Sequence, residues 1–128
     1  KSGKNSMSGV IFLAKICTLK KQKDFKLVYQ KGKVFGNRNL VMHYLKNGKD
    51  TNRLGIIVSK KVSNRAVVRN RIRRQLKEAY RLNENQFALG YDLVIIAKAS
   101  CKDEKYPVIE KSLKHLFYKK NLMRQDHD

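Results

Sequence analysis

A short amphipathic helix is predicted near the start of the chain, over residues 23–31. Its apolar face consists of Phe25, Val28 and Tyr29, which recur at the i, i+3, i+4 spacing of one side of a helix. Gly32 follows directly and is a common residue at the end of a helix. The segment therefore presents one apolar and aromatic side to the rest of the protein.

The next segment, residues 33–59, carries the pattern of β-strands. Alternation sends Leu40, Met42 and Tyr44 to one face and Val41, His43 and Leu45 to the other. The Asn-Arg-Asn sequence at 37–39 divides residues 33–46 into two strands. Asn-Gly-Lys-Asp at 47–50 is a turn signal, and a strand rich in Ile and Val follows at 53–59. The strands on either side of this turn are expected to pair as a hairpin.

Two further helices and one strand are predicted in the second half of the chain. Asn64 is expected to cap a helix that ends near Leu82. The strand at 92–98 is almost continuously apolar, which favours a central position in a sheet. Pro107 suits the first turn of a last helix, whose buried face would consist of Ile109, Leu113, Leu116 and Phe117. The predicted order is helix, three strands, helix, strand, helix, which indicates a mixed α/β fold.

The composition adds a strong positive charge to this picture. The chain has 128 residues, with 30 Lys and Arg against 10 Asp and Glu, and a formal net charge of +20. Its length suits one domain, which we place at residues 19–122, with an N-terminal extension at 1–18 and a tail at 123–128. A surface of this charge repels itself unless a polyanion neutralises it, so a phosphate backbone is the expected partner.

Membrane and disulfide-stabilised proteins are disfavoured by the pattern. The longest apolar run, residues 10–17, is interrupted by Lys15 and is far shorter than the roughly 20 residues that cross a bilayer. No small-x-small cleavage site of a signal peptide follows it. Cys17 and Cys101 are the only cysteines, and we interpret both as reduced, buried thiols of a cytoplasmic protein. No membrane partner is expected.

The predicted helix at 64–82 is the most informative segment. Residues 60–81 contain nine Lys or Arg and a single acid, Glu78. At about 100° per residue, one side carries Val68, Ile72, Leu76, Ala79 and Tyr80, and the opposite side carries Asn70, Arg73, Arg74, Lys77 and Arg81. A merely solvated helix face usually has both charge signs, and i,i+4 pairs cannot neutralise this one. We therefore expect the polar side to bind phosphates.

The residue types on this helix support the same interpretation. Six of the nine cations are Arg, whose guanidinium group binds phosphate through two parallel hydrogen bonds and stacks on bases. Asn70 lies between Arg69 and Arg71, where its amide could contact both a phosphate and a ribose 2′-hydroxyl; a simply solvated Asn is an equal alternative.

Intrinsic catalysis is not expected from the residues present. The ten acids are scattered along the sequence, and the three histidines lie on a predicted strand (His43), on the last helix (His115) and in the tail (His127). No glycine-rich phosphate loop, zinc-ligand spacing or nucleophile motif occurs. We expect no cofactor or metal bound by the protein alone.

Particular sequence motifs resemble a known family. Arg-Asn-Arg-Ile-Arg-Arg at 69–74, preceded by Arg-Leu-Gly-Ile-Ile-Val-Ser-Lys-Lys at 53–61, resembles the protein subunit of bacterial ribonuclease P. The resemblance extends back to Leu-Lys-Lys-Gln-Lys-Asp-Phe at 19–25 and forward to the strand at 92–97 and the helix around 112–116. Residues 1–18 lie outside it. The turn at 62–65 also differs from that of members with a shorter, glycine-containing connection.

The resemblance implies a fold and an activity. The fold would be a two-layer α/β sandwich, similar to some ribosomal proteins, in which the basic helix is a left-handed crossover between parallel strands, against the usual right-handed rule. The enzyme of this family removes the 5′ leader of precursor tRNA, and its catalytic centre, with Mg²⁺, belongs to a large RNA subunit. The protein, expected to be a monomer when free, would bind the catalytic RNA and precursor tRNA rather than DNA.

The resemblance also assigns residues to two RNA surfaces. The catalytic RNA would contact Arg65, Arg69, Asn70, Arg71, Arg73, Arg74, Lys77 and Arg81. The single-stranded leader would lie between the first helix and the sheet, away from the basic helix, against Phe25, Tyr29, His43, Ser59, Lys60, Lys61 and Lys98. Relatives can have Tyr at position 43, so stacking at His43 is expected to be weaker or pH-sensitive. Without the resemblance, ordinary packing of a short helix is the preferred interpretation of Phe25 and Tyr29.

One alternative function remains at this stage. Charge and size alone also permit a non-enzymatic ribosomal or nucleic-acid-packaging protein. Such a protein would not need an aromatic groove in addition to a basic helix, whereas the ribonuclease P subunit requires two distinct RNA surfaces.

Overall fold

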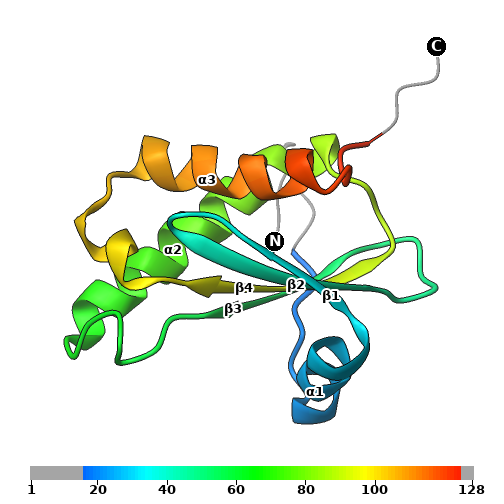
Figure 1. Ribbon diagram of the computed structural model, residues 1–128, viewed down its shortest axis with the longest axis horizontal. Coiled ribbons are helices and arrows are strands. Elements are labelled where there is room, and N and C mark those ends of the chain that lie inside the picture. Colours follow the sequence, from blue (N-terminus) through cyan, green and yellow to red (C-terminus); the bar gives the residue numbers. More distant parts are fainter. Residues whose placement is uncertain (1–15, 125–128) are drawn as a thin grey trace, which may run out of the picture.

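The computed structural model describes residues 16–124 and contains one four-stranded sheet with three α-helices (Figure 1). The elements in chain order are α1 (Gln22–Lys31), β1 (Lys33–Gly36), β2 (Leu40–Lys46), β3 (Arg53–Ile57), α2 (Ala66–Asn83), β4 (Tyr91–Ala97) and α3 (Tyr106–Lys119). Two short 3₁₀ turns, η2 (Glu84–Gln86) and η3 (Ala99–Asp103), precede and follow β4. The predicted order of helices and strands is confirmed.

The strand order in the sheet is β1-β2-β4-β3. β2 pairs antiparallel with β1 and β4, whereas β3 pairs in parallel with β4. The predicted hairpin between β2 and β3 is therefore wrong. After β2, the Asn47 N–H donates to the Gly90 carbonyl oxygen at the start of β4 (2.9 Å), so the chain passes across the end of β4. The turn signal specified a reversal of direction but not the pairing partner.

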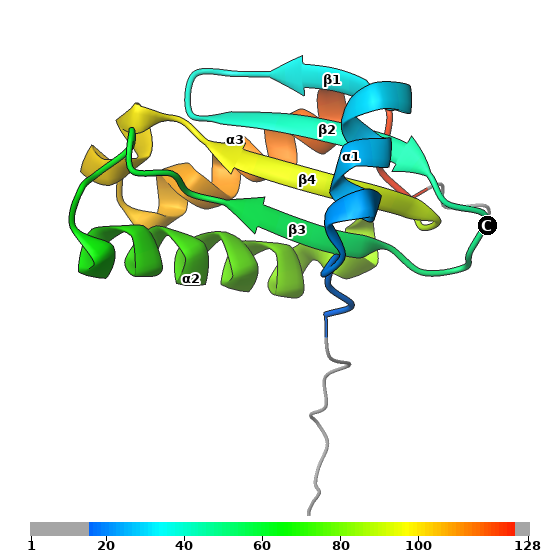
Figure 2. The ribbon, with the colours of Figure 1, turned by 90° about the horizontal axis from the view of Figure 1, so that it is seen from below.

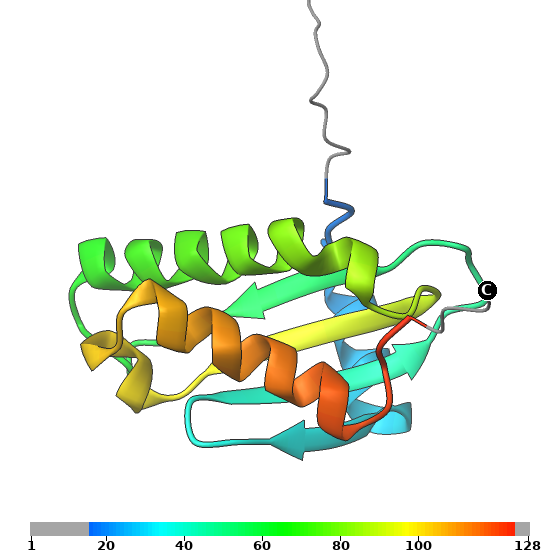
Figure 3. The same cartoon turned by 90° about the horizontal axis from the view of Figure 1, so that it is seen from above.

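β4 occupies the central position that its apolar sequence predicted. Its residues Leu93, Val94 and Ile95 are all buried, although they alternate between the two faces of the sheet. α2 and α3 cover one face and α1 crosses the other (Figures 2 and 3). The same two views show that β3, α2 and β4 form a left-handed crossover, as the family resemblance implied.

The main core lies between the sheet and the pair α2 and α3. The buried face of α3 consists of Ile109, Leu113, Leu116 and Phe117, as the spacing predicted. Phe117 stacks on Phe87 with ring centroids 3.8 Å apart. Each apolar side chain of this size stabilises the fold by about 1.5–3 kcal/mol when fully buried, so this layer fixes the orientation of α2.

Three local predictions differ from the structure. The N-cap of α2 is Arg65 rather than Asn64, and no side chain caps this helix. β3 ends at Ile57, so Ser59 belongs to the following turn. Cys101 is buried as expected, but Cys17 is exposed, and both thiols are free. The extension predicted at 1–18 lies mostly outside the described residues.

The outer edge of β3 is partly covered by the residues just before α1. The Leu54 N–H donates to the Cys17 carbonyl oxygen (2.8 Å), and the Leu19 N–H donates to the Leu54 carbonyl oxygen (3.0 Å). This bridge is limited to Leu54.

Within residues 16–124, no helix is long and apolar enough to cross a membrane.

A buried carboxylate connects α1, the β2–β3 loop and the sheet. Asp92 is 3% exposed and accepts two hydrogen bonds from the Arg53 guanidinium (2.9 and 2.7 Å) and one from the Asn47 amide (2.9 Å). Arg53 also contacts Asp24 of α1 at 3.5 Å. Burial by itself would raise the pKa of Asp92, but the hydrogen bonds from Arg53 and Asn47 outweigh it and hold this pKa below its ordinary value.

We predict that this carboxylate makes the fold acid-sensitive. Because the folded pKa lies below the unfolded value of about 3.9, the unfolded chain binds more protons in the interval between the two values. The stabilisation is complete above about pH 4 and is lost as the pH falls through the folded pKa. Urea unfolding of the Asp92→Asn variant should therefore show a deficit relative to wild type at pH 7 that shrinks below pH ~4. Asp50→Asn, in an exposed loop, is the control and should follow wild type. A deficit that does not change with pH would contradict this account.

Candidate nucleic-acid interface

The orientation of α2 separates its apolar and cationic sides. Ile72, Leu76, Ala79 and Tyr80 are buried against the sheet and α3. Asn70, Arg73, Arg74 and Lys77 are exposed on the opposite side. Both sets match the helical pattern of the sequence, except that Val68 and Arg81 are each only partly buried. The side of α2 expected to bind phosphates is therefore open to solvent.

The three cations on this side are Arg73, Arg74 and Lys77, and none of them pairs with a carboxylate among residues 16–124. Arg73 donates to the Asn70 Oδ1 atom (2.8 Å) and to the Val58 carbonyl oxygen (3.3 Å). In the described part of the chain, the ion pairs involve only Arg53 and Arg81. The positive charges of Arg73, Arg74 and Lys77 are therefore not neutralised within residues 16–124.

Three of the four remaining candidate arginines of this segment make local side-chain contacts. Arg69 donates to the Ser63 carbonyl oxygen (3.0 Å), and Arg71 donates to the Lys102 carbonyl oxygen (2.9 Å). Arg81 pairs with Glu78 at 2.6 Å. Arg65 is exposed at the start of α2. The sequence pattern treated these cations as equivalent, whereas the structure distinguishes Arg69 and Arg71, which contact neighbouring loops, and Arg81, which pairs within α2, from the cations that face solvent.

The aromatic residues predicted for the leader lie where α1 meets the sheet. Tyr29 is 41% exposed and contacts the His43 ring edge-to-face, with centroids 4.9 Å apart. Phe25 is partly buried beside Leu19, Val28 and Val94. Burial lowers the pKa of His43 and raises the pKa of Tyr29. Neither aromatic ring of α1 is fully enclosed, so both remain accessible to a ligand.

The predicted lysines lie at the other end of this sheet face. Lys60 and Lys61 are exposed just after β3, and the Ser59 Oγ atom accepts a hydrogen bond from the Lys61 N–H (3.2 Å). Lys98 directly follows β4 and donates to the Asn37 carbonyl oxygen (2.6 Å). Because β3 and β4 are parallel neighbours, these groups share one end of the sheet.

Between α1 and this end, no helix covers the sheet face (Figure 2). Val41, Ile57 and Ile96 are only partly buried there, and they lie in register on β2, β3 and β4. We refer to these three residues, with Tyr29 and His43, as the open sheet face. Sequence reasoning identified its two aromatic residues but not its aliphatic floor.

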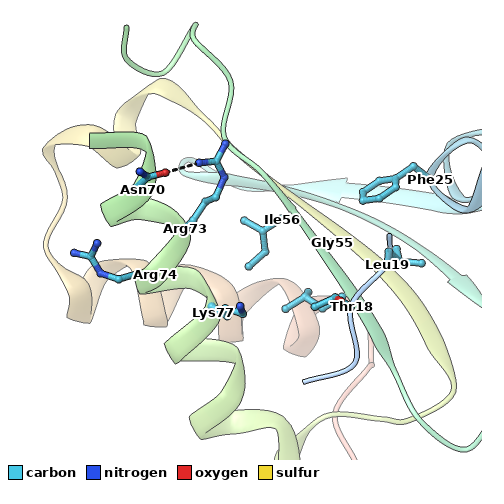
Figure 4. Close-up of a pocket in the computed structure, with 10 residues that line it drawn as sticks. Thr18, Leu19, Phe25, Gly55, Ile56, Asn70, Arg73, Arg74 and Lys77 are labelled. Carbon is cyan, nitrogen blue, oxygen red and sulfur yellow. Dashed lines mark hydrogen bonds between the residues drawn. The ribbon is translucent and has the colours of Figure 1, made fainter. Parts of the chain in front are cut away.

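A separate cleft lies around the outer edge of β3, with a volume of about 420 Å³ (Figure 4). One wall consists of Asn70, Arg73, Arg74 and Lys77 of α2, and the other consists of Thr18, Leu19, Phe25 and β3 residues 54–56. The expected groove, on the face away from α2, would have separated all of the aromatic residues from the cations. Phe25 instead lies at the outer edge of β3, in the same cleft as the cations of α2. The two predicted surfaces meet at β3.

Gly55 permits this position of Phe25. A Cβ atom at Gly55 would lie 2.6 Å from the Phe25 Cε1 atom, so the ring packs directly on the backbone of β3. Sequence analysis did not identify Gly55 as a site residue. Its occurrence within a predicted strand was the available signal, because Gly inside a strand often marks a close approach.

The described residues contain no cluster of three or more His, Cys, Asp or Glu arranged to hold a metal ion. Asp24 and Asp92 are both in contact with Arg53, and Glu78 is paired with Arg81. The arrangement favours binding of phosphates and unpaired bases through cations, aromatic rings and an apolar floor.

Comparisons with known proteins agree on one family. The family model described as Ribonuclease P matches residues 13–121. The ribonuclease P protein component of Alkaliphilus metalliredigens is 46% identical over 105 residues, which cover 82% of this chain and 94% of the relative. That of Clostridioides difficile is 52% identical over 99 residues, covering 77% of this chain and 86% of the relative. The match begins before residue 19, where the sequence resemblance began.

Solved structures show the same fold. The Staphylococcus aureus RNase P protein superposes with a TM-score of 0.78 at 34% identity and covers 86% of this chain and 100% of its own. The Thermotoga maritima RNase P protein gives a TM-score of 0.74 at 29% identity, over 80% and 96%. From the family match over most of the chain and the shared fold, we conclude that the chain belongs to the ribonuclease P protein family.

Proposed function

We propose that this chain is the protein subunit of a bacterial ribonuclease P and assists removal of the 5′ leader from precursor tRNA. The observation that carries the proposal is the row of exposed cations on α2, with no carboxylate partners among the described residues, in a member of this family. The relatives are ribonuclease P components, and no observation favours the ribosomal or packaging alternative.

The catalytic centre and its Mg²⁺ belong, in this proposal, to the RNA subunit. Metal-dependent hydrolysis of RNA needs carboxylates that converge on cations. Here Asp92 and Glu78 are instead held by Arg53 and Arg81, which supports a binding role for the protein. A cytoplasmic location is part of the same proposal and is supported by the two free thiols.

α2 is the proposed contact with the catalytic RNA. Arg73 is held in place by Asn70 and the Val58 carbonyl oxygen, so less side-chain freedom is lost when its guanidinium binds a phosphate. Arg74 and Lys77 extend the same positive surface. Each phosphate that these side chains neutralise releases condensed counterions, which gives the binding its salt dependence.

The open sheet face is the proposed contact with the leader. Its aromatic and aliphatic side chains offer stacking and apolar contact to unpaired bases, and Lys60, Lys61 and Lys98 lie near enough along the sheet to attract the phosphates. Stacking tolerates any base because every base has a π-face. This property suits an enzyme whose precursor tRNAs carry different leader sequences.

Simultaneous contact with both RNAs explains how a protein without a catalytic centre assists the reaction. A leader held on the sheet and a catalytic RNA held on α2 are brought together by one rigid domain, which raises their effective concentration. The protein cations also reduce the electrostatic repulsion between the two RNAs, so less Mg²⁺ is needed to bring the RNAs together.

The test of the proposed function is reconstitution with a bacterial ribonuclease P catalytic RNA. We expect the purified protein to cut no RNA alone and to increase the rate of precursor tRNA cleavage when it is added to that RNA at low Mg²⁺. Cleavage is followed by gel separation of leader and mature tRNA. Absence of stimulation at any protein concentration that saturates the RNA would contradict the proposal.

Loss of one exposed cation should weaken binding of the catalytic RNA. For Arg74→Ala we expect lower affinity and a log–log salt dependence that is shallower by about 0.7–0.9, the contribution of one phosphate contact. Binding is measured by filter retention or fluorescence anisotropy across a salt series. Lys119→Ala, an exposed cation on α3, is the matched control and should keep the wild-type slope. Equal slopes for wild type and Arg74→Ala would exclude this contact.

Loss of an exposed aromatic ring of α1 should weaken only the binding of precursors that carry a leader. Tyr29→Ala, which removes a 41% exposed ring of the open sheet face, is expected to reduce the affinity of the assembled enzyme for a long-leader precursor by about 1–3 kcal/mol, the value of one stacked base, and to leave mature tRNA binding unchanged. Tyr118→Ala removes a 71% exposed ring on α3 and serves as the control. If Tyr29→Ala and Arg74→Ala weaken the same binding step, the division into two RNA surfaces is wrong.

A further inference from the structure

The cleft at the edge of β3 has a chemical character that neither predicted RNA surface explains. Its volume of about 420 Å³ lies within the range of roughly 300–1,000 Å³ typical of pockets for small ligands. One wall is apolar, formed by Leu19, Phe25 and Ile56, and the opposite wall carries the cations of α2. A ligand that matches both walls has a flat or apolar body joined to an anionic group.

The cationic wall is prepared to receive an anion. Arg73 and Lys77 of α2 both line the cleft opposite β3, and the dashed line in Figure 4 marks the hydrogen bond between Asn70 and Arg73. No carboxylate among residues 16–124 pairs with either cation. An anion between these two side chains would therefore make its hydrogen bonds without displacing an existing ion pair.

The backbone of β3 supplies hydrogen-bonding groups to the same cleft. Leu54 directs its N–H and its carbonyl oxygen to residues 17–19, and the Val58 carbonyl oxygen accepts from Arg73. Because alternate residues of a strand direct their backbone groups to the same edge, the Ile56 N–H and carbonyl oxygen also face this edge. The bridge to residues 17–19 is limited to Leu54, so the groups of Ile56 lie beyond it.

From these three features we propose that the cleft binds a single unstacked nucleotide of RNA. Its phosphate lies between Arg73 and Lys77, its base packs against Leu19, Ile56 and the edge of Phe25, and the polar edge of the base meets the backbone of Ile56. This inference rests on the proposed function, because it assumes an RNA partner. The shared chemistry is an unpaired nucleotide, supplied either by the catalytic RNA or by the leader.

The first experiment titrates the full chain with adenosine 5′-monophosphate and, separately, with inorganic phosphate, and follows methyl and amide NMR signals. We expect the nucleotide to shift the Leu19 and Ile56 methyl signals and the Ile56 amide signal, and phosphate alone to leave the methyl signals in place. Lys77→Ala should weaken the nucleotide about tenfold, the effect of losing one charge-assisted hydrogen bond, while Lys119→Ala should not. Identical responses to nucleotide and phosphate, or no effect of Lys77→Ala, would overturn the site.

The second experiment identifies the source of the nucleotide. 4-Thiouridine is introduced at random uridines of the catalytic RNA in one arm and of the precursor leader in the other, and cross-linked peptides are mapped after irradiation of the assembled enzyme. A cross-link to residues 18–19 or 54–56 from either RNA supports the site and names its source. Cross-links elsewhere on the protein from both RNAs, with none to these residues, would overturn it. Failure of the proposed function is recognised separately, because wild-type protein would then not stimulate precursor cleavage.

Discussion

The packing of one narrow apolar stripe of α2 determines which side of this helix, and therefore which cations, face solvent. Ile72, Leu76, Ala79 and Tyr80 are almost completely buried, so α2 cannot rotate about its axis without exposing them to water. α2 is also the crossover between the parallel strands β3 and β4, and β3 is the edge strand of the sheet. These two constraints together place the exposed cations of α2 along an open strand edge.

The few acids of the chain leave these cations uncompensated. Asp24 and Asp92 share Arg53, which joins α1 to the sheet, and Glu78 pairs with Arg81 near the end of α2. With ten acids against 30 Lys and Arg, internal pairing leaves most of the positive charge at the surface. Repulsion among these cations is relieved when a polyanion binds, so the same charge distribution that limits the stability of the free protein favours its assembly with RNA.

The sequence was sufficient for features that depend on local spacing. The faces of β2, the buried side of α3 and the two sides of α2 all followed from the periodicity of apolar residues. The pairing of β2 with β4 did not, because the turn at 47–50 reports a change of direction and carries no information about which strands become neighbours. The exposure of Cys17 and the packing of Phe25 on Gly55 also arise from contacts between distant segments.

In the candidate site, too, the sequence predicted individual residues but not which distant segments come together. Pattern and family resemblance named the cations of α2 and the rings of Phe25, Tyr29 and His43, but they placed the two groups on separate faces. In the structure Phe25 reaches the outer edge of β3 and lines one cleft with Arg73 and Lys77. Only the strand order, which puts β3 at the edge of the sheet, makes that meeting possible.

The most direct measurement is a structure of the protein bound to the catalytic RNA and to a precursor tRNA with its leader. The account predicts phosphates of the catalytic RNA against Arg74 on the exposed side of α2, and a separate single strand across Tyr29, His43 and Ile96. A complex in which the cationic side of α2 faces solvent, or in which one RNA strand alone occupies both surfaces, would contradict it.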